Sequence, residues 1–385
     1  MKRIVLLVAS FPDSILHFRG ALIDALQASG ATVHVSVPDV HAGSALRGEL
    51  EARGVSVHAI PLQRAATNPG GDLRTLLHLW WLMRRLRPDM VLAYTIKPVI
   101  YGSLAAWLAR IPRRFALITG LGYAFQGQGQ RVAMRGLVQR LYALALARVD
   151  KVFFQNPDDQ AVFRELGIVS ARTPSVVVNG SGVDVAAYAV APLPEAPLCF
   201  LMIGRLLGDK GVREYAQAAR QVRDLHPEVR CVLVGWIDPN PNAITQSELD
   251  AWIADGRIEF HGRLSDIRLA IAQCSVYVLP SYREGTPRTV LEAMAMGRPI
   301  ITSDAPGCRE TVVDGDNGFL VPVKSVDALV QAMIRFIQSP ELVPRMGRRS
   351  RQIAEDKYDV HKVNAVMLRE MGIADRVSSG LTRHD

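Results

Sequence analysis

The sequence predicts an α/β protein built from two Rossmann-like domains. Short apolar runs typical of buried strands, beginning with IVLLVAS, TVHVSV and VSVHAI, alternate with segments of helical periodicity in the first half of the chain. This alternation indicates a parallel sheet with helices on both faces. It resumes at LCFLMIG after an interruption, and the length of 385 residues suits two domains with separate cores.

The interruption is a linker rich in glycine and proline. A Gly-Ser-Gly turn at 180–182 is followed by three prolines within 192–197, and this composition offers few side chains for packing. We therefore expect an N-terminal domain over residues 1–185 and a C-terminal domain over residues 198–358. Residues 359–385 are expected to form a final helix and a frayed polar tail.

The net charge of +8 is distributed unevenly along the chain. Residues 1–180 contain 21 Lys and Arg against 11 Asp and Glu, whereas the remainder is close to neutral. A cationic domain favours anionic lipid headgroups, a lipid diphosphate or nucleic acid as a partner, and a solvated Arg-rich surface is the simpler alternative. Nucleic acid is not expected, because the basic residues lack interleaved aromatic stacking motifs.

The composition also predicts a cytoplasmic protein. No apolar run reaches the ~18 residues that span a bilayer. The N-terminus MKRIVLLVAS lacks a small-x-small cleavage pattern and is followed by Pro12 and Asp13, which indicates a first strand rather than a signal peptide. The cysteines lack metal-ligand spacing, so we expect buried thiols in a reducing compartment at Cys199, Cys231, Cys274 and Cys308.

The first domain is expected to contain two basic helices, each with two interpretations. Before them, a loop over 11–16 leads into a helix over 18–28. The helix over 73–87 combines leucine and tryptophan with arginine, which suits either a membrane interface or packing on the sheet. The helix over 131–148 follows the polar loop QGQGQ and is either a peripheral sheet helix or a mobile element that meets a membrane-linked acceptor.

The stretch SYREGTPRTVLEAMAMGRPIITSD is typical of a loop, a helix and a strand. Pro287 suits the first helical position, and Gly297 suits the residue after the helix. The helix start at 286–289 attracts anions, above all phosphate. Because Glu284 and Glu292 lie beside it and carboxylates accept hydrogen bonds from sugar hydroxyls, the pattern favours a sugar-nucleotide site. The alternative is a buried turn whose glutamates only cap or solvate the helix.

A loop with two cations follows the first strand of the second domain. In GRLLGDKG, Arg205 and Lys210 follow the apolar run LCFLMI, and a helix is expected from about Val212. Fixed cations at the carboxyl end of a strand suit a diphosphate, because they offset the charge that grows as a phosphate leaves. The alternative is an ordinary loop with solvated cations.

These two elements together resemble the retaining glycosyltransferases of family 4, which have the GT-B fold. EGTPRTVLEAMA matches their glutamate-x7-glutamate element, and GRLLGDKG matches their arginine–lysine element. The resemblance implies that Glu284 contacts the transferred sugar and Glu292 the ribose, while Arg205 and Lys210 bind the donor diphosphate. It also implies two domains that face each other across a cleft, an acceptor-binding first domain, a donor-binding second domain and a C-terminal helix that returns to the first.

The resemblance extends the donor site to the start of the helix and to main chain beside the nucleotide base. No metal or other cofactor is expected, because fixed cations and a helix dipole take its place. The segment 314–316 matches the D-x-D metal pattern of another glycosyltransferase fold, but D-G-x-x-G between apolar residues indicates a turn. The added donor-side residues are Gly285, Thr286, Pro287, Arg288, Thr289, Gly262 and Leu264.

A second region resembles a narrower branch of the family. YTIKPVIYGSLAAWLA followed by ITGLGYAF is similar to enzymes that add an N-acetylated or related hexose to a sugar on undecaprenyl diphosphate. The first loop, SFPDSILHFRG, departs from the family because it lacks paired glycines. The implied acceptor-side residues are His17, Arg19, Tyr94, Thr95, Lys97, Thr119, Gly120 and Gly122.

The chain is therefore expected to be a retaining glycosyltransferase with Arg205, Lys210 and Glu284 as catalytic residues. We expect it to move a hexose or N-acetylhexosamine from a nucleotide sugar, UDP-linked, to a lipid-linked saccharide in bacterial surface glycan synthesis. Its basic first domain is expected to bind the anionic inner face of the cytoplasmic membrane. The alternatives are an epimerase or phosphorylase with the same fold, and a non-catalytic partner that binds nucleotide or lipid.

Overall fold

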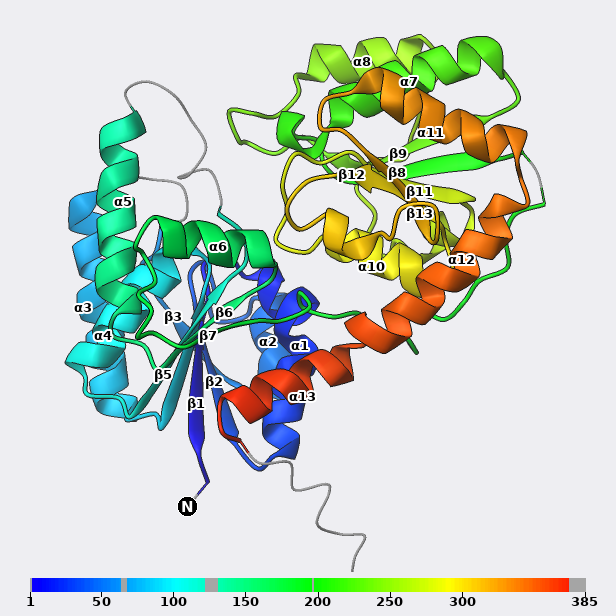
Figure 1. Ribbon diagram of the computed structural model, residues 1–385. Coiled ribbons are helices and arrows are strands. Elements are labelled where there is room, and N and C mark those ends of the chain that lie inside the picture. The colour runs from blue at the N-terminus through cyan, green and yellow to red at the C-terminus, as the bar shows by residue number, and fades with distance from the viewer. Residues whose placement is uncertain (1, 64–67, 122–130, 196, 374–385) are drawn as a thin grey trace, which may run out of the picture. The chain divides into compact units, whose positions relative to one another are not determined.

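The computed structural model describes residues 2–63, 68–121, 131–195 and 197–373 (Figure 1). The interpretations of Gly122, of the QGQGQ loop and of the polar tail concern residues outside these ranges. The chain divides into two compact units. Unit 1 is Met1–Ser181 with His361–Asp385, and unit 2 is Gly182–Val360.

Unit 1 contains a seven-stranded parallel sheet in the order β3-β2-β1-β4-β5-β6-β7. Its central strands consist of almost continuous apolar residues that are buried, as a parallel sheet covered on both faces requires. The strands are β1 (Ile4–Val8), β2 (Thr32–Val37), β3 (Ser56–Ala59), β4 (Met90–Tyr94), β5 (Arg113–Ile118), β6 (Lys151–Phe154) and β7 (Ser175–Val177).

Helices cover both faces of this sheet and form a separate core on each (Figure 1). Met367 and Leu368 near the chain's end are buried in one core, and Lys151 Nζ donates to Glu370 Oε2 at 2.6 Å. The last helix therefore packs on the N-terminal unit, as expected. The helices are α1 (Asp13–Ala28), α2 (Ala45–Ala52) and α13 (Val360–Glu370) on one face, and α3 (Pro69–Leu86), α4 (Ser103–Leu108), α5 (Arg131–Leu146) and α6 (Pro157–Glu165) on the other.

The first loop is shorter than the sequence suggested. The prediction that a helix begins near Phe18 is wrong, because α1 begins at Asp13. Pro12 already has helical dihedral angles, with φ −56° and ψ −53°, and its carbonyl accepts a hydrogen bond from the Ile15 amide at 3.0 Å. An acidic residue in the first turn also suits the positive end of the helix dipole.

Unit 2 contains a six-stranded parallel sheet in the order β10-β9-β8-β11-β12-β13. Its strands are β8 (Cys199–Arg205), β9 (Arg230–Trp236), β10 (Glu259–Phe260), β11 (Val276–Leu279), β12 (Ile300–Ser303) and β13 (Gly318–Val321). Its helices are α7 (Val212–Leu225), α8 (Gln246–Ala254), α9 (Arg268–Ala272), α10 (Arg288–Ala295), α11 (Val326–Gln338) and α12 (Leu342–Ile353).

Local signals in unit 2 act largely as predicted. Gly297 follows α10 with φ +77°, the left-handed conformation that ends many helices. Pro287 caps α10 rather than beginning it, because its ψ of 108° is extended. The segment 314–316 is a turn: Gly315 has φ +77°, and Asp314 Oδ1 accepts from the Leu320 amide at 2.9 Å.

Each sheet reverses its strand order at one point. The chain winds outward in both directions from β1 and β4 in unit 1, and from β8 and β11 in unit 2. Open α/β sheets bind ligands beyond the carboxyl ends of the strands at such a reversal. We call these places the unit 1 reversal, beyond Val8 and Tyr94, and the unit 2 reversal, beyond Arg205 and Leu279.

Candidate functional site

The residues predicted to bind a donor lie on the two connections that leave the unit 2 reversal. Arg205 ends β8, and Lys210 follows on a 3-10 turn, Gly208–Lys210, that leads into α7. Glu284 lies on the loop after β11, and Glu292 lies on α10. The fold therefore gathers these residues at the edge of the sheet where a ligand is expected.

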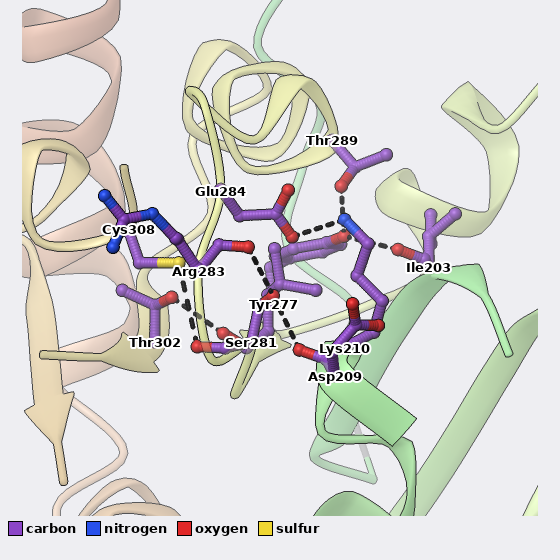
Figure 2. Close-up of polar contacts among 11 residues, drawn as sticks. Ile203, Asp209, Lys210, Tyr277, Ser281, Arg283, Glu284, Thr289, Thr302 and Cys308 are labelled. Atoms are coloured by element: carbon purple, nitrogen blue, oxygen red, sulfur yellow. Dashed lines mark hydrogen bonds and ion pairs between the residues drawn. The ribbon is translucent and has the colours of Figure 1, made fainter. Parts of the chain in front are cut away.

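Lys210 and Glu284 are in direct contact (Figure 2). The ammonium Nζ of Lys210 donates to Glu284 Oε1, and the two side chains are 21% and 12% exposed. Sequence reasoning assigned one residue to phosphate and the other to sugar, and the structure joins them in one ion pair. Glu284 therefore already holds the Lys210 ammonium in position before an anion binds to it.

The two loops that carry this pair are bonded to each other through main chain. The Asp209 carbonyl accepts hydrogen bonds from the Tyr282 amide at 2.8 Å and from Ser281 Oγ at 3.1 Å. Gly211 has φ +73°, and a Cβ atom there would lie 2.1 Å from the Pro280 carbonyl oxygen. Only glycine allows this approach, and the approach places Lys210 beside the β11 loop.

A third connection, which follows β12, contacts the main chain of Glu284. The Glu284 amide donates to the Pro306 carbonyl at 2.9 Å, and a Cβ atom on Gly307 would lie 2.2 Å from the Glu284 carbonyl oxygen. Burial, followed by the nearby Glu284 carboxylate, raises the pKa of the Cys308 thiol. That thiol therefore stays protonated at neutral pH and adds no charge to the site.

A buried tyrosine connects the strands of the reversal to the start of α10. The Tyr277 hydroxyl lies 3.1 Å from the Ile203 carbonyl oxygen on β8 and 2.7 Å from Thr289 Oγ1 (Figure 2). Burial raises the pKa of Tyr277, so the hydroxyl remains neutral. The predicted residues Gly285 to Thr289 form the end of the loop and the first turn of α10, next to this contact.

Glu292 is the most buried of the predicted donor-side carboxylates, with 4% of its surface exposed. Arg288 Nε donates to its Oε1 at 2.8 Å, one helical turn away. Burial, followed by the nearby Glu292 carboxylate, raises the pKa of the Tyr188 hydroxyl. A carboxylate has about four lone-pair sites, so one fixed in this way can accept further hydrogen bonds from a ligand.

Arg205 has a partner that the sequence analysis missed. Its Nη1 donates to Asp238 Oδ2 at 3.1 Å, and Asp238 Oδ1 accepts from the Asn240 amide at 3.0 Å. Asp238 lies just after β9, where a D-P-N turn at the end of a strand was the available signal. Both predicted phosphate-binding cations are thus paired with carboxylates.

At the unit 1 reversal the structure brings together hydroxyl groups. Ser10 Oγ lies 2.7 Å from Thr95 Oγ1, and Ser14 Oγ lies 3.1 Å from the Tyr94 hydroxyl. The buried Arg19 places its guanidinium 5.2 Å from the centre of the Tyr94 ring. Burial raises the pKa of Tyr94 to about 12, so this hydroxyl is neutral at physiological pH.

The other predicted acceptor-side residues are distributed around this reversal. Lys97 Nζ contacts Asp72 Oδ1 at 2.7 Å, and the Tyr101 hydroxyl donates to Asp72 Oδ2 at 2.9 Å. Thr119 and Gly120 follow β5, the neighbour of β4, and His17 is exposed on α1. Asp72 was not anticipated, because its partners follow it by more than twenty residues.

Comparison with known proteins identifies the family. Residues 188–353 match the family model "Glycosyl transferases group 1", and residues 3–156 match "Glycosyl transferase 4-like". The lipopolysaccharide core biosynthesis mannosyltransferase LpcC of Rhizobium leguminosarum bv. viciae is 30% identical over 280 residues, which cover 71% of this chain and 75% of LpcC. The chain belongs to the group 1 glycosyltransferases.

This glycosyltransferase is also similar to a second relative in sequence and to a solved structure in fold. It is 29% identical over 379 residues to the N,N'-diacetylbacillosaminyl-diphospho-undecaprenol alpha-1,3-N-acetylgalactosaminyltransferase of Campylobacter jejuni, covering 94% of this chain and 96% of that protein. The crystal structure of Anabaena Alr3699/HepE in complex with UDP matches with a TM-score of 0.77 at 20% identity, covering 97% and 100% of the two chains. The prediction of a GT-B fold with two Rossmann-like domains is confirmed.

Proposed function

We propose that this glycosyltransferase moves a hexose or N-acetylhexosamine from a nucleotide sugar, UDP-linked, to a saccharide carried on a lipid diphosphate, with retention of configuration. The observation that carries the proposal is the contact between Lys210 and Glu284 at the unit 2 reversal. The names of the relatives support the acceptor class, because the Campylobacter protein and an Escherichia coli galactosyltransferase, 28% identical over 280 residues, are both named for diphosphoundecaprenol-linked substrates.

In this proposal Arg205 and Lys210 bind the donor diphosphate. An ammonium has three N–H donors and a guanidinium has five, so each can keep its carboxylate partner and still bond phosphate oxygens. As the sugar–phosphate bond breaks, negative charge grows on the departing diphosphate. Fixed cations in a partly buried site lower the energy of that state more than that of the ground state. No metal or other cofactor is required, because these cations supply the charge.

The two glutamates orient the rest of the donor. Glu284, whose Oε1 accepts from Lys210, accepts hydrogen bonds from hydroxyls of the transferred sugar. Glu292, which Arg288 holds in position, accepts hydrogen bonds from the ribose hydroxyls. The residues at the start of α10 add the positive end of a helix dipole next to the diphosphate.

The acceptor hydroxyl is proposed to attack on the face from which the diphosphate leaves, with a phosphate oxygen taking its proton. Such same-face attack retains configuration without a protein nucleophile. The unit 1 reversal supplies the acceptor side. Ser10 and Thr95 supply hydroxyls that bond sugar hydroxyls, Tyr94 supports Ser14 from within the core, and Lys97 lies near enough to the end of β4 to attract a lipid diphosphate.

We also propose that unit 1 associates peripherally with the inner face of the cytoplasmic membrane. No helix in the described part of the chain is long and apolar enough to cross a bilayer. On α3, Leu73, Leu77 and Trp81 recur at helical spacing and are 55%, 53% and 53% exposed, and Arg84 and Arg85 occupy the last turn. An apolar stripe with adjacent arginines suits the interface of an anionic bilayer.

A donor screen tests the proposed reaction. Membranes that contain lipid-linked sugars are incubated with the enzyme and a panel of UDP-sugars, and the masses of the lipid products are measured by mass spectrometry. We expect one lipid product heavier by a hexose or N-acetylhexosamine, and NMR should show the donor's anomeric configuration in the new bond. Consumption of a UDP-sugar without an acceptor would instead indicate an epimerase, and donor binding without any turnover would indicate a non-catalytic partner.

The variant Glu284→Gln should lower kcat/KM by about 100-fold, because it removes the charge beside Lys210 and changes the sugar contact. Glu51→Gln is the matched control, since Glu51 pairs with Arg47 on α2 at 2.8 Å and is 49% exposed. The control should retain wild-type turnover. Wild-type turnover in Glu284→Gln would contradict the assigned site.

A further inference from the structure

The side chain of Tyr282 joins the loop after β11 to the first turn of α7. Its hydroxyl donates to Glu214 Oε1 at 2.5 Å, a distance typical of a hydrogen bond to a charged carboxylate. Partial burial, followed by this bond to Glu214, raises the pKa of the Tyr282 hydroxyl. The hydroxyl therefore keeps its proton and remains a donor at neutral pH. In the proposed reaction neither residue contacts the donor sugar nucleotide.

The Glu214 carboxylate depends on this hydrogen bond. Its other oxygen, Oε2, is buried and has no hydrogen-bond partner in the described part of the chain. A buried carboxylate that loses its donors is costly, and a negative charge in the first turn of α7 is favoured by the helix dipole. Glu214 therefore stays charged and holds the Tyr282 hydroxyl firmly.

Two contacts of Tyr282 enclose the segment that carries Lys210. The Tyr282 amide donates to the carbonyl of Asp209, just before Lys210, at 2.8 Å. The Tyr282 hydroxyl bonds Glu214, which lies beyond Lys210 on α7. Glu284 lies on the same loop as Tyr282 and meets Lys210 in the ion pair. Tyr282 thus fixes the spacing between the two segments that carry the members of the pair.

A lysine from a third connection covers the Tyr282 ring. Lys324, between β13 and α11, places its Nζ 5.0 Å from the ring centre, within the range of a cation–π contact. Lys324 has φ +64°, the left-handed conformation that residues other than glycine rarely adopt. The ring is therefore held at its hydroxyl by Glu214 and on its face by Lys324.

We propose that Tyr282 is a positioning residue for the Lys210–Glu284 ion pair, and this inference rests on the proposed function. A fixed cation lowers the barrier when it already lies where charge develops on the departing diphosphate. A displacement of about 1 Å can cost about 100-fold in rate. Tyr282 acts on the reaction through the pair, because it determines how closely the loop after β11 approaches the start of α7.

Tyr282→Phe, measured in the wild-type chain and in Glu284→Gln, tests the assignment by steady-state kinetics. In the wild-type chain it should lower kcat about tenfold and change the KM for donor less than about twofold, because position matters most in the transition state. In Glu284→Gln, which has already lost the charged pair, it should lower kcat less than about twofold, since residues that act through each other are not additive.

Two variants of Glu214 separate position from stability. Glu214→Gln keeps a carbonyl oxygen that accepts from Tyr282, so it should retain most of the wild-type kcat. The double variant Tyr282→Phe with Glu214→Gln removes the bond without leaving a buried charge, so the chain should fold. It should show the same loss of kcat, about tenfold, as Tyr282→Phe alone.

Tyr215→Phe is the matched control. Tyr215 follows Glu214 on α7, but its hydroxyl contacts the Phe200 and Val232 carbonyl oxygens at 2.9 and 3.1 Å inside the core. This variant should lower the free energy of unfolding and keep the wild-type kcat. Wild-type kcat in Tyr282→Phe, or an equal loss of kcat in both backgrounds, overturns the positioning role alone. If the wild-type chain transfers no sugar, the proposed function fails and the inference fails with it.

Discussion

The two strand-order reversals have the same topology and different chemistry. At the unit 2 reversal, Lys210 and Glu284 form a partly buried ion pair, and Arg205 pairs with Asp238. At the unit 1 reversal, Ser10 and Thr95 place two hydroxyls 2.7 Å apart. Charge-assisted hydrogen bonds suit a diphosphate, whereas neutral hydroxyls suit the hydroxyls of a sugar. The shared fold therefore provides the position of a site, and the side chains decide what binds there.

The two reversals also differ in how backbone supports the site. In unit 2, Gly211 and Gly307 allow loops to approach so closely that a Cβ atom would lie about 2 Å from a carbonyl oxygen. In unit 1, Thr95 itself has φ +70°, an unusual value for a β-branched residue. Such strain persists where surrounding structure enforces it and is frequent at functional sites.

The largest expected effect comes from removing the charge at the unit 2 reversal. Lys210→Met should lower kcat/KM by about 100- to 1000-fold, because a fixed cation stabilises the departing diphosphate in the transition state. Steady-state kinetics with the identified donor measures this change. Lys362→Met, an exposed position on α13, is the control and should behave as wild type. A loss of less than tenfold in Lys210→Met would show that charge does not distinguish the two reversals.

The next effect concerns the close approach at Gly211. Gly211→Ala should lower the free energy of unfolding by about 2–4 kcal/mol, because it combines left-handed strain with a backbone clash. Gly256→Ala separates the two causes, since Gly256 has φ +70° but open space around its Cβ position, and it should cost about 1–2 kcal/mol. Denaturant unfolding measures both variants. Equal losses would mean that the approach of the two loops is not tight.

The smallest effect is expected at the unit 1 reversal. The double variant Ser10→Ala with Thr95→Val should raise the KM for acceptor about 30-fold, because the two lost neutral hydrogen bonds contribute about 1 kcal/mol each. The KM for donor should not change. Ser29→Ala, which removes a hydroxyl bonded to the Leu26 carbonyl at 2.6 Å, is the control. An equal rise in the KM for donor would contradict the assignment of the acceptor to unit 1 and of the donor to unit 2.

Much of the local structure was predictable because its causes are local. The alternation of apolar runs and helical segments predicts the parallel sheets, and Gly297 ends α10 as expected. The start of α1 was misplaced by five residues, since Pro12 and Asp13 suit a helix start as well as a loop. The candidate donor residues were predictable from two short motifs, because Arg205 with Lys210, and Glu284 with Glu292, are close in sequence.

Other features depended on residues that are distant in sequence. Lys210 meets Glu284 across 74 positions, and Ser10 meets Thr95 across 85. The contacts of Asp238 and Asp72 likewise join residues that are far apart in the sequence.

The amino-acid sequence by itself determined the α/β class, the order of the elements and the residue types able to bind a sugar nucleotide. Only the tertiary structure decided that Lys210 and Glu284 share an ion pair and that Arg205 pairs with Asp238. The physical reason is that helix and strand formation follow from neighbours along the chain. Strand order and loop contacts follow from long-range packing, which no local pattern specifies.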